Sequence, residues 1–413
     1  MSAQHQQTAT GPYRSRQFPH LRSLLFALMR RMLGRLEYGR LLIETPAGER
    51  LIVEGRRPGP NAQMTIQSWR FLWRLIARLD IGFAESYIAG EWSSPNLGML
   101  MTFALQNADA VKPNRWLHLP RILRRLRHGL NRNTKRGSRR NVAAHYDLGN
   151  EFYAQWLDPS MSYSSGLFSA VGQTLEDAQE ARLQRVFELL AMSGAERVLE
   201  IGCGWGGLAE RLIDRYRCDV TGVTLSAKQL AFARERLRDR GLSRHGDLRL
   251  QDYRDVQGSY DRIVSIEMLE AVGEAYWPTY FRQLRDNLRP GGIAVLQVIT
   301  IEEARFESYR QLPDFIQRYI FPGGMLPTKS IVKREIAAAD LTLLSAELFG
   351  ESYAQTLIEW QRRFQEAWPA IERLGFDDRF KKTWEYYLSY CQAGFESKAI
   401  NVGLYAICNG LSR

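Results

Sequence analysis

Cysteine is scarce in this chain, with four residues among 413. The four stand far apart, without a Cys-x-x-Cys pair and without a histidine-rich segment beside them. A disulfide framework and a metal site are therefore not expected, and the composition favours a reducing compartment. The four residues are Cys203, Cys218, Cys391 and Cys408.

Long apolar runs are also missing. The longest near the N-terminus is LLFALM, residues 24–29, which Arg30 and Arg31 end at once. A run of this length is too short to span the hydrocarbon core of a membrane, and it makes a poor signal-peptide core. The sequence therefore predicts a cytoplasmic protein.

Acidic residues are few in the first third of the chain. Residues 1–140 hold 24 Lys and Arg against 8 Asp and Glu, whereas residues 141–413 hold 32 against 37. Residues 112–140 contain eleven basic residues, no acidic one, and aliphatic residues at roughly helical spacing. Such a segment is typical of a helix on an anionic phospholipid membrane, which predicts a peripheral protein at the inner membrane face. A solvated linker helix is the alternative. Nucleic acid is not expected, because the interleaved residues are aliphatic and not aromatic.

Composition divides the chain into two main units. In the first, apolar and polar residues alternate around PAG over 40–55, which predicts a hairpin, and residues 68–79 have helical periodicity. This unit is expected to be a small α+β domain that binds lipid or membrane. The predicted division is a disordered segment (1–20), the basic domain (21–130), a linker (131–140) and a second domain (141–413).

From residue 174 onward, helical stretches alternate with apolar strands, which predicts an α/β fold with a doubly wound parallel sheet. The last strand has no helix after it, so we expect it to pair antiparallel at an edge. The expected strands are 197–202, 219–225, 248–253, 260–268, 293–300, 341–349 and 400–409.

The segment VLEIGCGWGG, residues 198–207, predicts a strand, a glycine turn and a helix. It lacks the Lys-Ser/Thr of a Walker loop. Its spacing is G-x-G-x-G, and GVTLS (222–226) has no acidic residue at the end of the second strand, so a dinucleotide is not favoured either. S-adenosylmethionine carries a positively charged sulfonium and no phosphate. Its binding site therefore needs backbone that approaches closely and an acidic side chain nearby. The candidate cofactor residues are Glu200, Gly202, Gly204, Gly206, Thr224, Gln229 and Tyr253, the last as a stacking face for adenine.

Several long motifs resemble the cyclopropane-fatty-acyl-phospholipid synthase family, which includes the mycolic-acid cyclopropane synthases. The resemblance covers nearly the whole chain, and GFAESYIAGEW (82–92) extends it to the N-terminal unit. The other matching segments are AHYDLGNEFYAQWLDPSMSYS (144–164), VLEIGCGWGG (198–207), GVTLSAKQ (222–229), LQDYRD (250–255), DRIVSIEMLEAVG (261–273), RYIFPGGMLP (318–327), SYAQTLIEW (352–360) and YYLSYCQAGF (386–395).

This resemblance implies a class I methyltransferase with a Rossmann-like, seven-stranded, mostly parallel sheet and S-adenosylmethionine as methyl donor. The implied substrate is the cis double bond of an unsaturated phospholipid acyl chain. The alkene attacks the activated methyl, a carbocation remains, and a bound bicarbonate removes a proton so that a ring closes. Besides the glycine turn, the resemblance assigns cofactor contacts to Tyr163, Ser164, Thr224, Leu225, Gln229, Asp252, Tyr253 and Arg254.

The chain departs from the family where bicarbonate would bind. The family cysteine is Ser165, and two histidines are replaced by Ala271 and Gln297, whereas Glu270 and Tyr353 are retained. Serine and glutamine still donate hydrogen bonds but do not titrate near neutral pH. Glu270 then becomes a candidate base.

We therefore predict a lipid C-methyltransferase that gives a methyl- or methylene-branched acyl chain. Plain cyclopropanation is the alternative, and a small-amine methyltransferase and a non-catalytic membrane-binding protein are two further classes. The candidate catalytic residues are Glu270, Tyr353, Ser165, Gln297 and, because the family position was once regarded as catalytic, Cys391. The sequence is also compatible with a homodimer.

Overall fold

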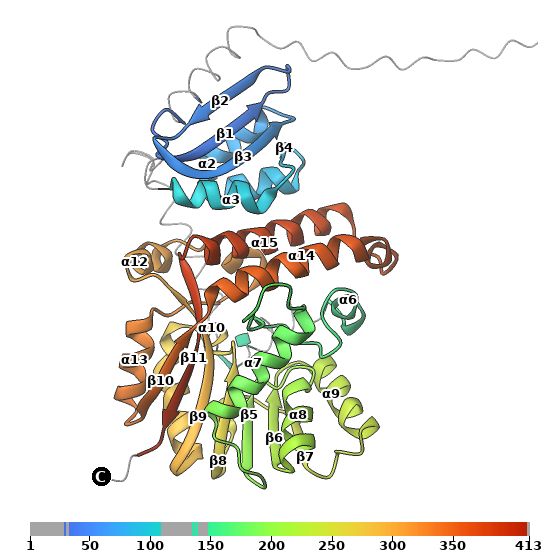
Figure 1. Ribbon diagram of the computed structural model, residues 1–413, viewed down its shortest axis with the longest axis vertical. Coiled ribbons are helices and arrows are strands. Elements are labelled where there is room, and N and C mark those ends of the chain that lie inside the picture. Colours follow the sequence, from blue (N-terminus) through green and yellow to red (C-terminus); the bar gives the residue numbers. More distant parts are fainter. Residues whose placement is uncertain (1–28, 30–32, 109–133, 136, 139–147, 411–413) are drawn as a thin grey trace, which may run out of the picture.

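The computed structural model describes residues 29, 33–108, 134–135, 137–138 and 148–410. The segment expected to be disordered, 1–20, lies outside the described residues, as does most of the basic segment 112–140. Figure 1 shows a small sheet with its helices at one end of the molecule and a large sheet at the other. Two long helices lie between them.

The small unit is a four-stranded sheet in the order β2-β1-β3-β4, with two helices. The predicted hairpin is present, because β1 and β2 pair antiparallel, while β3 runs parallel to β1. Apolar residues alternate along the strands, so that one face is buried against the helices. The elements are β1 (Tyr38–Glu44), β2 (Arg50–Glu54), β3 (Arg57–Ile66), α2 (Arg70–Ile88), β4 (Trp92–Ser93) and α3 (Leu97–Gln106).

The helix predicted over 68–79 is longer than expected. It continues to Ile88, and Leu79 interrupts it with φ 52° and ψ −125°. A left-handed φ at a leucine is costly, and here it marks a kink within α2.

The large sheet has seven strands in the order β10-β11-β9-β8-β5-β6-β7 and confirms the expected α/β fold. β11 is antiparallel, as predicted, but it is not at the edge: it pairs with β9 on one side and β10 on the other. The strands are β5 (Arg197–Ile201), β6 (Asp219–Thr224), β7 (Gly246–Leu250), β8 (Tyr260–Ile266), β9 (Leu288–Ile301), β10 (Thr342–Leu348) and β11 (Ile400–Cys408).

Helices cover both faces of this sheet and its carboxyl edge (Figure 1). They are α6 (Asn150–Ala154), α7 (Leu175–Leu189), α8 (Gly207–Tyr216), α9 (Ala227–Asp239), η2 (Tyr253–Asp255), α10 (Leu269–Val272), η3 (Glu274–Tyr276), α11 (Trp277–Asn287), α12 (Glu303–Gln311), the π-helical turn η4 (Ile316–Ile320), α13 (Lys329–Ala338), α14 (Gly350–Arg373) and α15 (Asp378–Glu396).

The helical pair α14 and α15 joins the two units. α15 packs against α3 and α2, and one apolar core continues from Leu41 and Phe103 of the small unit to Trp384 and Phe395 of α15. Polar contacts tie the same surfaces together. Thr102 donates to Glu396 at 2.7 Å and Tyr87 donates to Glu385 at 3.1 Å.

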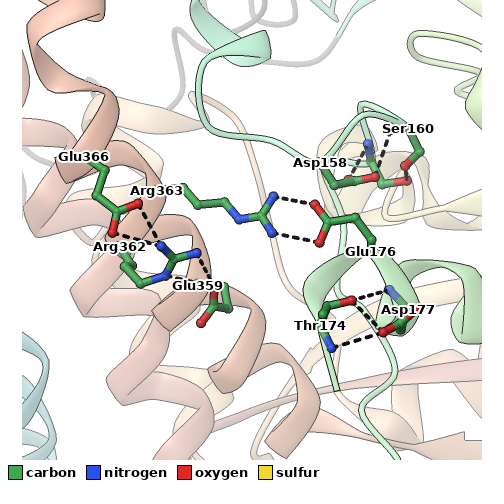
Figure 2. A network of polar contacts seen from close by, with 10 residues as sticks. Asp158, Ser160, Thr174, Glu176, Asp177, Glu359, Arg362, Arg363 and Glu366 are labelled. Carbon is green, nitrogen blue, oxygen red and sulfur yellow. Dashed lines mark hydrogen bonds and ion pairs between the residues drawn. The ribbon is translucent and has the colours of Figure 1, made fainter. Parts of the chain in front are cut away.

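A two-point ion pair holds α14 over the large sheet. Arg363 donates to both carboxylate oxygens of Glu176 in α7, at 2.7 and 2.9 Å (Figure 2). Glu176 stands in the first turn of α7, beside the capping pair Thr174 and Asp177. The planar guanidinium of Arg363 binds both carboxylate oxygens, which fixes the direction of the contact as well as its distance. This ion pair therefore helps to set how α14 crosses the carboxyl ends of the strands.

None of the described helices has the length and apolar character that a membrane span requires.

The shared core predicts that the two units unfold together. Trp384 is 3% exposed and stacks on Phe380, with Phe152 edge-on at 5.1 Å. Trp384→Ala should therefore lower the free energy of unfolding by about 3–5 kcal/mol, measured in urea by circular dichroism and tryptophan fluorescence. The same change at Trp73, 62% exposed, should cost less than about 1 kcal/mol. Two separate transitions in the wild type would contradict a common core.

Candidate active site

The glycine turn follows β5, as predicted. Gly202 and Gly206 have φ of +88° and +79°, which favour glycine. The N–H of Gly202 donates to Val223 at 2.9 Å, and a Cβ on Gly206 would lie 2.9 Å from that of Ala233. Gly204, also left-handed, faces the Gln229 amide. Glycine is therefore favoured at residues 202 and 206 by the backbone conformation, and at Gly206 also by close packing on α9.

Glu200 ends β5 beneath this turn. It is 4% exposed, and its Oε2 has no hydrogen-bond partner among the described residues. Burial raises the pKa of its carboxyl to about 8. A buried acceptor without a donor is costly unless a ligand supplies one. Glu200 thus fits a cofactor that brings hydroxyl or ammonium donors.

The segment after β6 contributes a second group of candidate cofactor residues. Ser226 caps α9 by accepting from Gln229 N, and its own N–H donates to Thr224 Oγ1 at 3.2 Å. Thr224 and Gln229 are buried and lie 3.2 Å apart, from Oγ1 to Oε1. Leu225 lies between them in the chain and is partly exposed. The three residues are therefore together, as the sequence predicted.

The turn η2 contributes a third group of candidate cofactor residues. Arg254 grips Asp252 with Nε at 2.8 Å and Nη2 at 2.6 Å, and these bonds outweigh burial and lower the pKa of the aspartate. Tyr253 is 5% exposed and meets Tyr280 edge-on, so its ring belongs to the core of the sheet. From the linker, Ser138 accepts from Arg254 at 3.3 Å.

Three segments converge on a carboxylate that the sequence did not single out, Glu267 directly after β8. Its Oε1 accepts from the Ser164 hydroxyl (2.8 Å), the Ser165 N–H (3.3 Å) and the Gln297 amide (2.8 Å). Its Oε2 accepts from the Tyr353 hydroxyl at 2.7 Å. The residues assigned to an anion pocket therefore surround a side chain of the protein itself.

Glu267 stands in a strained conformation. Its φ is 50°, and its N–H donates to the Gln297 carbonyl at 2.9 Å. A left-handed glutamate costs free energy and persists only where its surroundings fix it, which is common at functional sites. The signal in the sequence was a second glutamate three residues before Glu270.

Glu270 is the second buried acid of the site. Its Oε1 accepts from Ile299 N at 2.5 Å, whereas Oε2 has no partner among the described residues. Burial, and then the charge of Glu267, raise its pKa to about 8. Glu270 is therefore largely protonated at neutral pH, whereas the sequence suggested that it acts as the base.

A buried cation was also missed. Arg182 of α7 is 3% exposed, donates to Gln179 at 3.2 Å, and is close enough to Glu267 and Glu200 for its charge to act on both. Replacement of two family histidines therefore does not leave the site without positive charge. No local pattern identifies a buried arginine in an otherwise ordinary amphipathic helix.

Two of the candidate catalytic residues do not present their side chains to this carboxylate. The Ser165 hydroxyl donates to Gly166 O at 2.8 Å, so only its N–H reaches Glu267. Burial raises the pKa of the Cys391 thiol, which keeps it protonated and unreactive.

Aromatic rings line the site beside Glu267. Tyr163 and Tyr387 share a hydrogen bond of 2.7 Å between their hydroxyls, and Trp360 lies 5.2 Å from the Tyr163 ring and 6.1 Å from that of Tyr353. Trp156 closes the group against Trp360. Ring faces of this kind attract cationic groups and suit apolar chains.

Comparison with known proteins settles the family. Residues 133–404 match the model for mycolic acid cyclopropane synthetase. The chain belongs to this family. It is 38% identical to tuberculostearic acid methyltransferase UfaA1 of Mycobacterium tuberculosis, over 78% of this chain and 77% of the relative. It is 33% identical to the cyclopropane-fatty-acyl-phospholipid synthase of Escherichia coli, over 87% and 91%.

Solved structures agree with this membership. The cyclopropane synthase MmaA2 of Mycobacterium tuberculosis aligns with a TM-score of 0.62 at 29% identity, covering 65% of this chain and 98% of that one. A complex of CmaA1 with S-adenosylhomocysteine aligns equally well at 28% identity. The protein is thus a class I methyltransferase of a lipid-modifying family, with S-adenosylmethionine as methyl donor.

The glycine turn and the Glu200 oxygen that has no partner among the described residues suit this cofactor. The raised pKa of Glu200 leads to a prediction. A carboxyl whose pKa is raised from 4.5 to about 8 by folding keeps its proton while the unfolded chain releases it, so it destabilises the fold increasingly from pH 4.5 to 8. Glu200→Gln should therefore stabilise the ligand-free protein more at pH 8 than at pH 5, measured by thermal unfolding.

The same variant should bind S-adenosylmethionine at least about tenfold more weakly in calorimetry, because an amide cannot release a proton and accept hydrogen bonds at both of its polar atoms as a carboxyl group can. Glu210→Gln, in the first turn of α8, serves as the control for a helix acid close by. Unchanged cofactor affinity in Glu200→Gln would remove Glu200 from the cofactor site.

Proposed function

We propose that the protein transfers a methyl group from S-adenosylmethionine to the cis double bond of an unsaturated phospholipid acyl chain and releases a methyl- or methylene-branched product. The observation that carries this proposal is the carboxylate of Glu267, which takes the hydrogen bonds of Ser164, Ser165, Gln297 and Tyr353. In this proposal the base is a side chain of the protein itself, and it takes the place of the bicarbonate ion that the family resemblance implies.

The two buried acids divide one negative charge. Burial raises the pKa of Glu267, but four donors and the charge of Arg182 oppose this. Glu270 has one donor, and its pKa is raised to about 8. Two adjacent carboxyls in a dry site do not both ionise readily, so the one with more donors holds the charge. Glu267 is therefore the base and Glu270 the protonated partner.

The reaction needs little more than this base. S-adenosylmethionine supplies a sulfonium methyl, which the π electrons of the alkene take up, leaving a carbocation on the acyl chain. Glu267 accepts a proton from the chain carbon next to the cation, and the C–H electrons form a new double bond in a methyl-branched chain. If a hydride first shifts to the cation, Glu267 takes the proton from the new methyl and a methylene branch results. Tyr353 and Gln297 hold the carboxylate in place, and the surrounding aromatic rings stabilise the positive charge.

The relatives support a branched product. The chain is 38% identical to a protein named as a tuberculostearic acid methyltransferase, and matches below this include sphingolipid C9-methyltransferases at 31–33% identity. The family description and the Escherichia coli synthase support ring closure instead. Ring closure needs the same base, so the product decides between the two.

The basic first third of the chain favours action on phospholipid in a membrane rather than on a free small molecule. We place the protein in the cytoplasm, bound peripherally to the inner face of an anionic membrane, with residues 21–130 as the lipid-binding domain, 131–140 as the linker and 141–413 as the methyltransferase domain.

Two conservative variants separate the roles of the acids. Glu267→Gln should lower the turnover number by about 10²–10⁴, because the amide cannot accept a proton. Glu270→Gln should keep activity within about fivefold at pH 7, since an amide resembles the protonated acid already present. Transfer of radioactive methyl into lipid measures both, with Glu274→Gln as a surface control and cofactor binding as the check of integrity. Equal losses in Glu267→Gln and Glu270→Gln would contradict the division of charge.

The product is identified by mass spectrometry of unsaturated anionic phospholipid after reaction, with and without hydrogenation that spares cyclopropanes. We expect a species heavier by one CH₂ that takes up hydrogen, because deprotonation of the chain leaves a double bond. A species of the same mass that takes up no hydrogen is a ring and would replace the branched product by cyclopropane.

A further inference from the structure

Helix α2 has two unlike halves. After the interruption at Leu79, residues 81–88 pack into the shared core, where Ile81 and Ala84 are 1% and 0% exposed. Before it, Phe71 and Leu72 are each 4% exposed and belong to the same core, whereas Trp73 is 62% and Ile76 37% exposed. A large indole held out from a well-packed helix is unusual in a soluble domain and marks a surface that another phase or molecule covers.

The exposed charged side chains around Trp73 and Ile76 are mainly arginines. The side chains of Arg70 and Arg78 are 79% and 52% exposed, whereas their partners Glu91 and Glu85 are 7% and 13% exposed. The carboxylates therefore lie beneath and the guanidinium groups lie outside. Within α2, Asp80 at the interruption is the exposed acid. Arginine beside tryptophan is the composition that anchors proteins at the headgroups of anionic lipids.

This surface continues toward the active site through η4. Tyr319 donates to Glu85 at 2.6 Å, and Arg318 lies 3.7 Å from the same carboxylate. η4 is a π-helical turn, a feature frequent at functional sites. Directly after it, Phe321 lies against Tyr387, whose hydroxyl bonds Tyr163 in the wall of the site.

The loop that follows η4 reaches the catalytic acids. Met325 donates its N–H to the Glu270 carbonyl at 2.8 Å. Only residues 320–324 thus separate Tyr319, which is 38% exposed, from Met325, which bonds the backbone of Glu270. A chain of contacts runs from the outer face of α2 to the buried carboxyls.

We propose that Arg70, Trp73, Ile76 and Arg78 of α2, with Arg318 and Tyr319 of η4, form one face that docks on an anionic phospholipid bilayer. We call it the α2 face. Trp73 and Ile76 enter the headgroup region, the arginines bind lipid phosphates, and the acyl chain leaves the bilayer beside η4 toward Glu267. The docking stands on the exposed residues alone, while the route of the acyl chain rests on the proposed function.

The test uses the full chain and vesicles of phosphatidylglycerol and phosphatidylcholine, with pure phosphatidylcholine for comparison. Trp73→Ser should weaken partitioning onto the anionic vesicles about tenfold, because the largest apolar group of the face is lost. Arg70→Gln should weaken it several-fold at low salt and less at high salt. Ile358→Ser, at an apolar residue of α14 that is 44% exposed, is the matched control and should bind like the wild type.

Brominated phospholipid gives a second readout that does not depend on a disruptive change. Part of the tryptophan emission of the wild type should be quenched on brominated vesicles, and the conservative Trp73→Phe should bind the same vesicles but lose that part. Equal vesicle affinity of Trp73→Ser and Ile358→Ser, or unchanged quenching in Trp73→Phe, would overturn the α2 face. Methyl transfer by the wild type to detergent-dispersed lipid is measured in parallel. Its absence counts against the proposed function and leaves the vesicle result to decide the docking.

Discussion

The site is organised around one carboxyl group, that of Glu267. A carboxylate removed from water needs hydrogen-bond donors in place before it is stable, and here they come from three separate segments of the chain. Ser164 and Ser165 come from the loop before α7, Gln297 from β9, and Tyr353 from α14. The order of strands in the large sheet places β8 beside β9, so the glutamate and the glutamine meet.

The same constraint explains why α14 is fixed so firmly. It carries Tyr353 to Glu267, and the Arg363–Glu176 ion pair holds it to α7 (Figure 2). α7 also supplies Arg182, whose charge acts on Glu267 and Glu200. α15 then packs α14 against the small unit (Figure 1). The small unit and the helix that carries Tyr353 therefore share one apolar core.

Much of this architecture could be predicted from the sequence, because strand and helix patterns are local and the glycine turn has a distinctive spacing. The placement of the late strand was only half right: its antiparallel direction followed from the absence of a helix after it, but its position between β9 and β10 depends on long-range pairing. The site was predicted by resemblance, which selects known positions. It therefore missed Glu267 and Arg182, to which the resemblance assigns no role, and it did not reveal that the Ser165 hydroxyl turns to Gly166.

The most direct test of the account is the dependence of methyl transfer on bicarbonate. The purified protein is assayed with unsaturated phospholipid in buffer freed of carbon dioxide, before and after bicarbonate is restored, with the Escherichia coli synthase as a parallel sample. Because Glu267 already occupies the hydrogen bonds of the anion pocket, we expect the rate to be the same in both buffers. A rate that falls on depletion and recovers with bicarbonate would show that a free anion is the base, and would contradict the assignment of that role to Glu267.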